Sequence, residues 1–147
     1  MILADANATE AAGRTLAPLL RGGDIVALSG DLGAGKTSLA RGILAGLGLI
    51  EDAPSPTFPI VIPYDPPLVS LPVWHVDLYR LDTPEDVDEL GLDDALFDGA
   101  LLIEWPERLG NRLWPEALVL RLEPEPQGGR SLTAIVPPSW EARWPFQ

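Results

Sequence analysis

Residues 30–37 read GDLGAGKT, which has the spacing G-x-x-x-x-G-K-[ST] of a phosphate-binding loop, or P-loop. The apolar run 24–29 comes directly before it and predicts a buried strand. After it, apolar residues recur at helical spacing through 38–47 and predict a helix with one buried face. Strand, glycine-rich loop and helix in this order predict an α/β fold built around a P-loop.

The residue types in this stretch suit an anionic ligand. Glycines let backbone N–H groups curl around phosphate oxygens, and the N-terminus of the following helix adds partial positive charge. Lys36 is expected to reach the β- and γ-phosphates, and the Thr37 hydroxyl is expected to bind Mg²⁺. Lys36 is also the only lysine of the chain. A glycine-rich turn that binds nothing is the alternative, but the pattern arises by chance only on the order of once in a thousand such chains.

Size and charge exclude several classes of protein. A chain of 147 residues predicts one domain, spanning 1–147. The net charge of −12 argues against a protein that binds DNA or RNA by its own surface, because phosphate contacts need Lys and Arg. Without cysteine, disulfides and thiolate metal sites are excluded. No signal peptide or membrane-spanning run is evident, so we expect a cytoplasmic protein without membrane contact.

Further strands and helices are predicted around the P-loop unit. A helix is expected after Thr9, which is a plausible N-cap. Thr83-Pro84 followed by acidic residues predicts another helix start. The other predicted elements are an edge strand at 2–4, a hairpin of strands 60–64 and 73–79, a short helix at 92–97 and closing strands at 117–122 and 131–136.

Two segments allow two interpretations each. The proline-rich stretch 51–59 is either a rigid connector or a switch-like loop whose Ser55 and Thr57 approach the γ-phosphate or Mg²⁺. The tail from 137, which contains two tryptophans, either docks on the body of the protein or binds something else.

Polar residues within the predicted strand 73–79 are candidates for the site. His75, Asp77 and Tyr79 are spaced by two and are expected to share one face. For His75, the only histidine, a structural role is favoured over that of an essential base, because phosphoryl transfer depends mainly on positioning and charge stabilisation. Asp77 must be paired, hydrogen-bonded or near a cation if it lies within an apolar strand.

A second acidic candidate ends the apolar run 100–103. Glu104 is the kind of residue that holds Mg²⁺, directly or through water, when its strand lies beside a P-loop. The alternative is an ordinary glutamate at a strand end. Trp105 follows and fits either the core or a partner surface.

These motifs stand in the order that is found in one known family. After GDLGAGKT come SPTF (55–58), HVDLYRL (75–81), ELGLDD (89–94) and LIEWPERL (102–109). This set resembles the bacterial TsaE (YjeE) family, the small ATPase of tRNA threonylcarbamoyladenosine (t6A) biosynthesis. The resemblance extends from the first predicted helix to Arg130, and the tail cannot be matched to it.

The resemblance implies a compact α/β P-loop NTPase domain with a mixed central sheet flanked by helices. It implies Mg²⁺-dependent binding and hydrolysis of ATP, slow alone because no arginine lies in an evident finger position. The partners would be TsaB and TsaD, with TsaD carrying the transfer chemistry on adenosine 37 of tRNAs that read ANN codons. Hydrolysis would support repeated turnover of that pair, and tRNA would be reached through the partners.

Site residues follow from the same resemblance. The catalytic set would be Lys36, Asp77 and Glu104, with Asp77 orienting Mg²⁺ or water, and Thr37 and Glu104 would be the Mg²⁺ ligands. The nucleotide would be contacted by Ala6, Asp31, Leu32, Gly33, Ala34, Gly35, Lys36, Thr37, Ser38 and Gly129. Ser38 replaces the family's second threonine but keeps a hydroxyl, whereas Pro59 stiffens the loop after SPTF.

Two other functions fit a P-loop protein. A partner-binding module could use ATP and ADP only to set its affinity, without essential hydrolysis. A small-molecule kinase is disfavoured, because the chain has no arginine-rich lid segment and no insert for an acceptor substrate.

Overall fold

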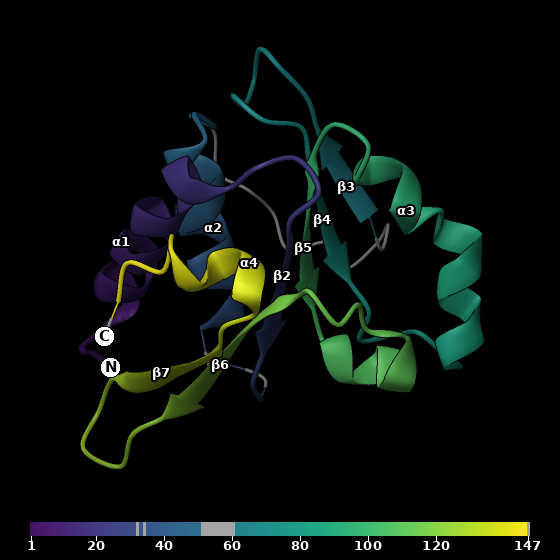
Figure 1. Ribbon diagram of the computed structural model, residues 1–147. Coiled ribbons are helices and arrows are strands. Elements are labelled where there is room, and N and C mark those ends of the chain that lie inside the picture. Colours follow the sequence, from purple (N-terminus) through teal and green to yellow (C-terminus); the bar gives the residue numbers. More distant parts are fainter. Residues whose placement is uncertain (32, 34, 51–60, 147) are drawn as a thin grey trace.

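A seven-stranded mixed sheet forms the centre of the computed structural model, which describes residues 1–31, 33, 35–50 and 61–146. The strand order is β1-β7-β6-β2-β5-β4-β3 (Figure 1). β2 is parallel to β5 and β6, and β5 is parallel to β4, whereas β1, β7 and β3 run antiparallel to their neighbours. The strands are β1 (Ile2–Leu3), β2 (Ile25–Ser29), β3 (Val61–Tyr64), β4 (Val73–Asp77), β5 (Ala100–Glu104), β6 (Leu118–Pro124) and β7 (Arg130–Ile135).

Helices cover both faces of this sheet, so the predicted α/β fold with a mixed, helix-flanked sheet is confirmed. One face carries α1 (Ala6–Leu16), the 3₁₀ turn η1 (Ala17–Leu19), α2 (Lys36–Gly46) and α4 (Pro138–Glu141) (Figure 1). The other carries the 3₁₀ helix η2 (Pro84–Leu90), α3 (Leu92–Ala95) and the 3₁₀ helix η3 (Pro106–Arg112). Each face has its own hydrophobic cluster, and β2 and β5 between them are buried along their whole length.

The position of α2, and hence of the P-loop that precedes it, depends on two glycines. A Cβ atom on Gly13 of α1 would lie 2.5 Å from the carbonyl oxygen of Leu39, and one on Gly42 of α2 would overlap the carbonyl of Glu10. The helices therefore touch backbone to backbone, which no larger residue would allow. This contact fixes α2 against α1.

The predicted N-cap of the first helix is wrong. α1 begins at Ala6, and its cap is Asp5, whose Oδ1 accepts a 2.9 Å hydrogen bond from the backbone N–H of Ala8. Thr9 lies inside the helix, fully buried, and its hydroxyl donates to the carbonyl of Asp5. Asp5 is the N-cap because its carboxylate accepts a hydrogen bond from a free N–H group in the first turn of the helix.

Several other predicted boundaries shift. β4 ends at Asp77, so Tyr79 lies beyond the strand that was expected to carry it. The helix predicted after Thr83 is a 3₁₀ helix with the expected cap, because the backbone N–H of Thr83 donates to Asp86 and Pro84 is the first helical residue. The helix expected at 92–97 spans only Leu92–Ala95.

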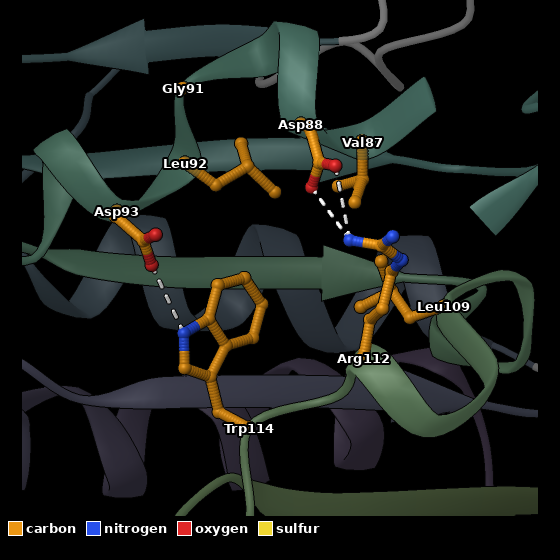
Figure 2. A pocket seen from close by; sticks show the side chains of 8 residues that line it. All are labelled: Val87, Asp88, Gly91, Leu92, Asp93, Leu109, Arg112 and Trp114. Carbon is orange, nitrogen blue, oxygen red and sulfur yellow. Dashed lines mark hydrogen bonds and ion pairs between the residues drawn. The ribbon is translucent and has the colours of Figure 1, made fainter. Parts of the chain in front are cut away.

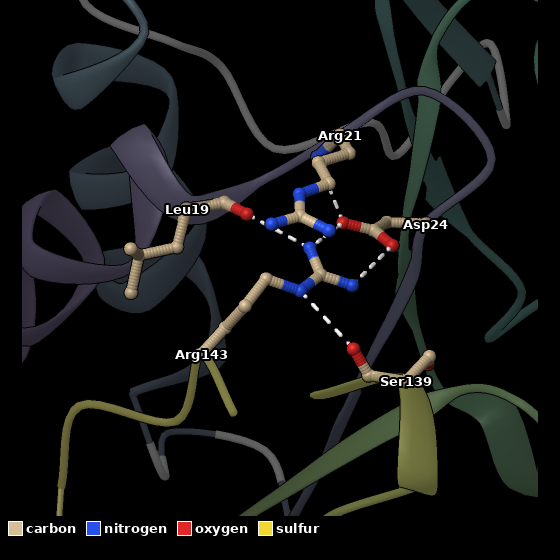
Figure 3. A network of polar contacts seen from close by, with 5 residues as sticks. All are labelled: Leu19, Arg21, Asp24, Ser139 and Arg143. Atoms are coloured by element: carbon tan, nitrogen blue, oxygen red, sulfur yellow. Dashed lines mark hydrogen bonds and ion pairs between the residues drawn. The ribbon is translucent and has the colours of Figure 1, made fainter. Parts of the chain in front are cut away.

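The tail docks on the body of the protein, which decides between its two interpretations. Trp140 is 1% exposed and belongs to the cluster beneath α1 and α2. Arg143 donates to both carboxylate oxygens of Asp24, at 2.7 and 3.0 Å, and to the carbonyl of Leu19 (Figure 3). Asp24 directly precedes β2, so the tail braces the start of the P-loop strand.

Two predictions concern residues outside the described part of the chain. They are the interpretations of the loop 51–59, with Ser55, Thr57 and Pro59, and the nucleotide contacts of Leu32 and Ala34. Within the described residues, no helix is both long and apolar enough to cross a membrane.

Candidate nucleotide-binding site

The sheet brings three candidate segments to one edge. β2 leads into the P-loop at Ser29, and α2 begins at Lys36 after Gly35, which has a left-handed φ of 105°. Glu104 at the end of β5 lies in register with Leu28 of β2 on one side and with Asp77 of β4 on the other. Because these strands are parallel, their carboxyl ends meet beside the P-loop, where α/β sheets bind ligands.

Lys36 points into this edge and is 5% exposed. Its ammonium donates to the backbone carbonyls of Gly30 and Asp31, and it lies 3.7 Å from the ring centroid of Trp105. Burial lowers the pKa of Lys36, although Glu104 and other nearby carboxylates oppose that shift. The nearby carboxylates offset only part of the cost of burying this ammonium. An anion bound at the loop would therefore stabilise its charged form.

Glu104 is held by His75. Oε2 of Glu104 lies 2.7 Å from Nε2 of His75, and the two side chains are 3% and 1% exposed. Nδ1 of His75 has no hydrogen-bond partner among the described residues. A carboxylate can accept about four hydrogen bonds or metal contacts, so one contact to His75 among the described residues leaves Glu104 capacity for a ligand. The geometry supports the structural interpretation of His75, which orients Glu104.

Asp77 is half-buried on the neighbouring strand. Its Oδ1 accepts a 2.9 Å hydrogen bond from the backbone N–H of Tyr79. Burial raises the pKa of Asp77 and Glu104 adds to the rise, while the Tyr79 N–H, His75 and Lys36 lower it. Asp77 thus has the hydrogen bond and the nearby cation that were expected, but they do not offset the whole effect of burial on its pKa.

Trp105 follows Glu104 in the chain and packs against the lysine. It adopts a left-handed conformation, with φ 62° and ψ 51°, which is costly for a tryptophan. This backbone places its ring both under the Lys36 ammonium and 4.9 Å from the ring of Tyr79. The aromatic ring faces the site, an arrangement that the sequence did not distinguish from core or partner surface.

The opposite flank is formed by the turn before β7. Gly129 (φ 74°) lies so close to Leu3 and Ala4 that a side chain would collide with their carbonyl oxygens. Arg130, the next residue, extends its guanidinium against Gly35 of the P-loop. Ala6, exposed at the start of α1, follows Ala4 by two residues, so this flank joins the predicted contacts at Ala6 and Gly129 to the P-loop.

Arg130 is the site residue that the sequence analysis missed. Nothing local in the sequence tells which arginine faces the P-loop. Of the other predicted residues that the structure describes, Asp31 and Gly33 are exposed in the loop, and Thr37 and Ser38 are half-buried in the first turn of α2.

The donor set fits a nucleotide with a hard cation. No group of three or more His, Asp and Glu within the described residues could hold a metal ion alone. Mg²⁺ is typically bound by one or two carboxylates together with substrate phosphates, which is what Glu104, Asp77 and the Thr37 hydroxyl beside a P-loop would supply. The N-terminus of α2 and the Lys36 ammonium suit the phosphates themselves.

Comparisons with known proteins identify the family. The model of the family described as threonylcarbamoyl adenosine biosynthesis protein TsaE matches residues 3–132. Proteins named tRNA threonylcarbamoyladenosine biosynthesis protein TsaE are 44% identical in Streptomyces coelicolor, over 76% of both chains, and 34% identical in Bacillus subtilis, over 85% of this chain and 77% of that one.

A solved structure agrees with these matches. The crystal structure of Bacillus subtilis YdiB superposes with a TM-score of 0.78 at 30% identity, over 94% of this chain and 85% of the other. The family match spans the P-loop, the carboxylate edge and the Gly129 turn together. On the evidence of its sequence, its fold and the residues gathered at this edge, the chain belongs to the TsaE family of tRNA threonylcarbamoyladenosine biosynthesis proteins.

Proposed function

We propose that this protein is the Mg²⁺-dependent ATPase that supports t6A formation on adenosine 37 of tRNAs reading ANN codons. One observation carries the proposal: Lys36 of the P-loop lies within electrostatic range of the carboxylates of Glu104 and Asp77, at the carboxyl edge of three adjacent strands. A loop that binds phosphate, with acids beside it, is the constellation required for Mg²⁺-assisted phosphoryl transfer to water.

Each residue has a role in this proposal. Lys36 contacts the β- and γ-phosphates, and the backbone of the loop from Asp31 to Ser38 surrounds them. Thr37 and Glu104 are the Mg²⁺ ligands, and Asp77 orients Mg²⁺ or the attacking water. Mg²⁺, when bound, neutralises charge on the phosphate oxygens. Ala6 and Gly129 contact the remainder of the nucleotide.

The proposed partners are TsaB and TsaD, in the cytoplasm, with the whole chain acting as one domain. Hydrolysis resets the TsaB–TsaD pair for repeated turnover, and TsaD performs the transfer. A net charge of −12 supports an indirect contact with tRNA, because this surface repels phosphates.

The test is ATP hydrolysis by the purified protein, alone and with purified TsaB and TsaD, with and without Mg²⁺. We expect slow, Mg²⁺-dependent hydrolysis that rises with the partners. Lys36→Ala is expected to abolish ATP binding, with Arg14→Ala on the exposed side of α1 as the control. Normal ATP binding by Lys36→Ala would refute the site, and hydrolysis indifferent to the partners would refute the role in t6A synthesis.

A nucleotide-dependent switch without essential hydrolysis is the second candidate. It is favoured by the contacts of Lys36 with the Gly30 carbonyl and with Trp105, because a nucleotide would redirect this side chain and could move its neighbours. Glu104→Gln separates the two functions. If hydrolysis is lost while tRNA modification continues over many turnovers, the protein acts as a nucleotide-dependent switch.

A further inference from the structure

A pocket of about 400 Å³ lies away from the P-loop, on the helical layer that covers β4 and β5 (Figure 2). One wall comes from η2 and the start of α3, and the other comes from η3 and the segment after it. Its volume is within the range of pockets that bind small ligands or single side chains. None of the residues assigned to the nucleotide site lines it.

The pocket has an apolar base and polar ends. Val87, Leu92 and Leu109 form the base and are buried. At one end Nη1 of Arg112 lies 2.9 and 3.1 Å from the two carboxylate oxygens of Asp88. At the other end the indole N–H of Trp114 donates to Asp93 at 3.2 Å (Figure 2). A ligand there would meet a half-buried indole, two carboxylates and the guanidinium of Arg112.

The surroundings of the pocket are strongly acidic. Between residues 82 and 98 the chain has no lysine, arginine or histidine. Its carboxylates there are Asp82, Glu85, Asp86, Asp88, Glu89, Asp93, Asp94 and Asp98. Arg112 is the one basic residue that lines the pocket, and it is already paired with Asp88. The lining itself, with Asp88, Asp93 and Arg112, carries a net negative charge.

We propose that this pocket binds an arginine side chain, flanked by apolar residues, from a partner protein. A guanidinium stacks well on an indole and pairs with carboxylates through planar hydrogen bonds, and the arginine stem suits an apolar base. Asp88 and Asp93 pair with the guanidinium, and Trp114 stacks on its plane. Leu92 contacts the flanking apolar side chain. The same acidic field excludes RNA as the occupant.

This surface adjoins the nucleotide site through the chain itself. η3 begins two residues after Glu104 and supplies Leu109 and Arg112 to the pocket. A partner bound here would therefore contact the segment that follows Glu104 and Trp105. The proposal does not depend on ATP hydrolysis, because it concerns only the recognition of a cationic segment.

The test follows the indole N–H of Trp114 by NMR in the ¹⁵N-labelled protein, with its signal assigned from Trp114→Phe. The probes are the peptides acetyl-Leu-Arg-Leu-amide and acetyl-Leu-citrulline-Leu-amide, which differ only in the charge of the central side chain. We expect a saturable shift with the arginine peptide and binding weaker by about tenfold with citrulline, since the ionic hydrogen bonds are lost.

Two variants with the same change of charge locate the effect. Asp88→Asn/Asp93→Asn removes the carboxylates of the pocket, whereas Asp82→Asn/Asp98→Asn removes two exposed carboxylates of the same segment that do not line it. We expect the first to weaken arginine-peptide binding by about tenfold and the second by less than about twofold. No saturable shift in the unmodified protein, equal binding of citrulline, or equal losses in the two variants would each overturn the proposal.

Discussion

Nε2 of His75 lies 2.7 Å from Oε2 of Glu104, and both side chains are almost completely excluded from solvent. The pair joins β4 to β5 directly below the P-loop edge. A carboxylate that has to remain available for a ligand is thus held in one orientation by a neighbour that need not react. This relationship gives the first prediction.

His75→Leu should destabilise the protein by about 3 kcal/mol, because it leaves a buried carboxylate without its partner. Glu104→Gln added to His75→Leu should recover most of that loss, since a neutral amide is less costly to bury. Urea denaturation of the three proteins, measured by far-UV circular dichroism, gives the free energies of unfolding. A double variant no more stable than His75→Leu would show that the loss of stability does not come from the unpaired Glu104 carboxylate.

Asp77→Asn should raise stability at pH 7 while it impairs hydrolysis. The pKa of Asp77 is raised above 3.8 in the folded protein, so folding disfavours the ionised carboxyl. The penalty is present at neutral pH and fades as the pH falls through the folded pKa toward 3.8, where both states become protonated. Because the group is half-buried, we expect a gain of only about 0.5–1 kcal/mol.

The measurement for Asp77 is thermal unfolding between pH 4 and pH 8, without nucleotide and with EDTA to remove Mg²⁺. The difference between Asp77→Asn and the unmodified protein should shrink toward the acidic end. A difference that is constant across this range would mean that the charge of Asp77 is not its cause.

Arg130→Ala should weaken ATP binding by about tenfold, the loss that corresponds to one charge-assisted contact. The reason is that its guanidinium lies against Gly35, at the mouth of the P-loop. Titration calorimetry with ATP and Mg²⁺ measures the change. Arg14→Ala removes an exposed arginine of α1 that pairs with Glu10, and it should leave ATP affinity unchanged. Equal affinities of Arg130→Ala and the unmodified protein would remove Arg130 from the site.

Arg143→Ala should cost about 2–3 kcal/mol of stability, because Asp24 would lose the guanidinium and remain largely buried. Arg112→Ala is the matched control. It breaks an arginine–aspartate pair that is 38% and 63% exposed, and such surface pairs contribute less than about 1 kcal/mol. Denaturant unfolding of both variants tests the contrast. Similar losses of stability in the two variants would mean that burial does not increase the contribution of the Asp24–Arg143 pair.

The fold could be predicted because short stretches of sequence indicate its main elements. The apolar runs of β2 and β5, the P-loop pattern and the cap at Thr83-Pro84 each follow from a few neighbouring residues. Element ends were less certain because two residues competed for one role. Asp5 and Thr9 both suit an N-cap, and only the packing of Thr9 in the interior decides between them.

The site could be predicted in its residue types but not in its contacts. Asp77 and Glu104 were proposed from their strand positions, and the parallel register of β4 and β5 makes them neighbours. The register is a property of the whole sheet, so the His75–Glu104 pair and the approach of Arg130 to Gly35 had no local signal. The roles proposed for these residues in binding and hydrolysis remain predictions.

The ion pair between Asp24 and Arg143 joins residues that are 119 positions apart in the chain. During translation the strand that leads into the P-loop is made early, yet its carboxylate at Asp24 gains its cation only after Arg143 has left the ribosome. The parallel neighbours of that strand, β5 and β6, are also made later. A nascent chain halted just before residue 143 would therefore hold a fully paired P-loop strand whose buried Asp24 still lacks its cation.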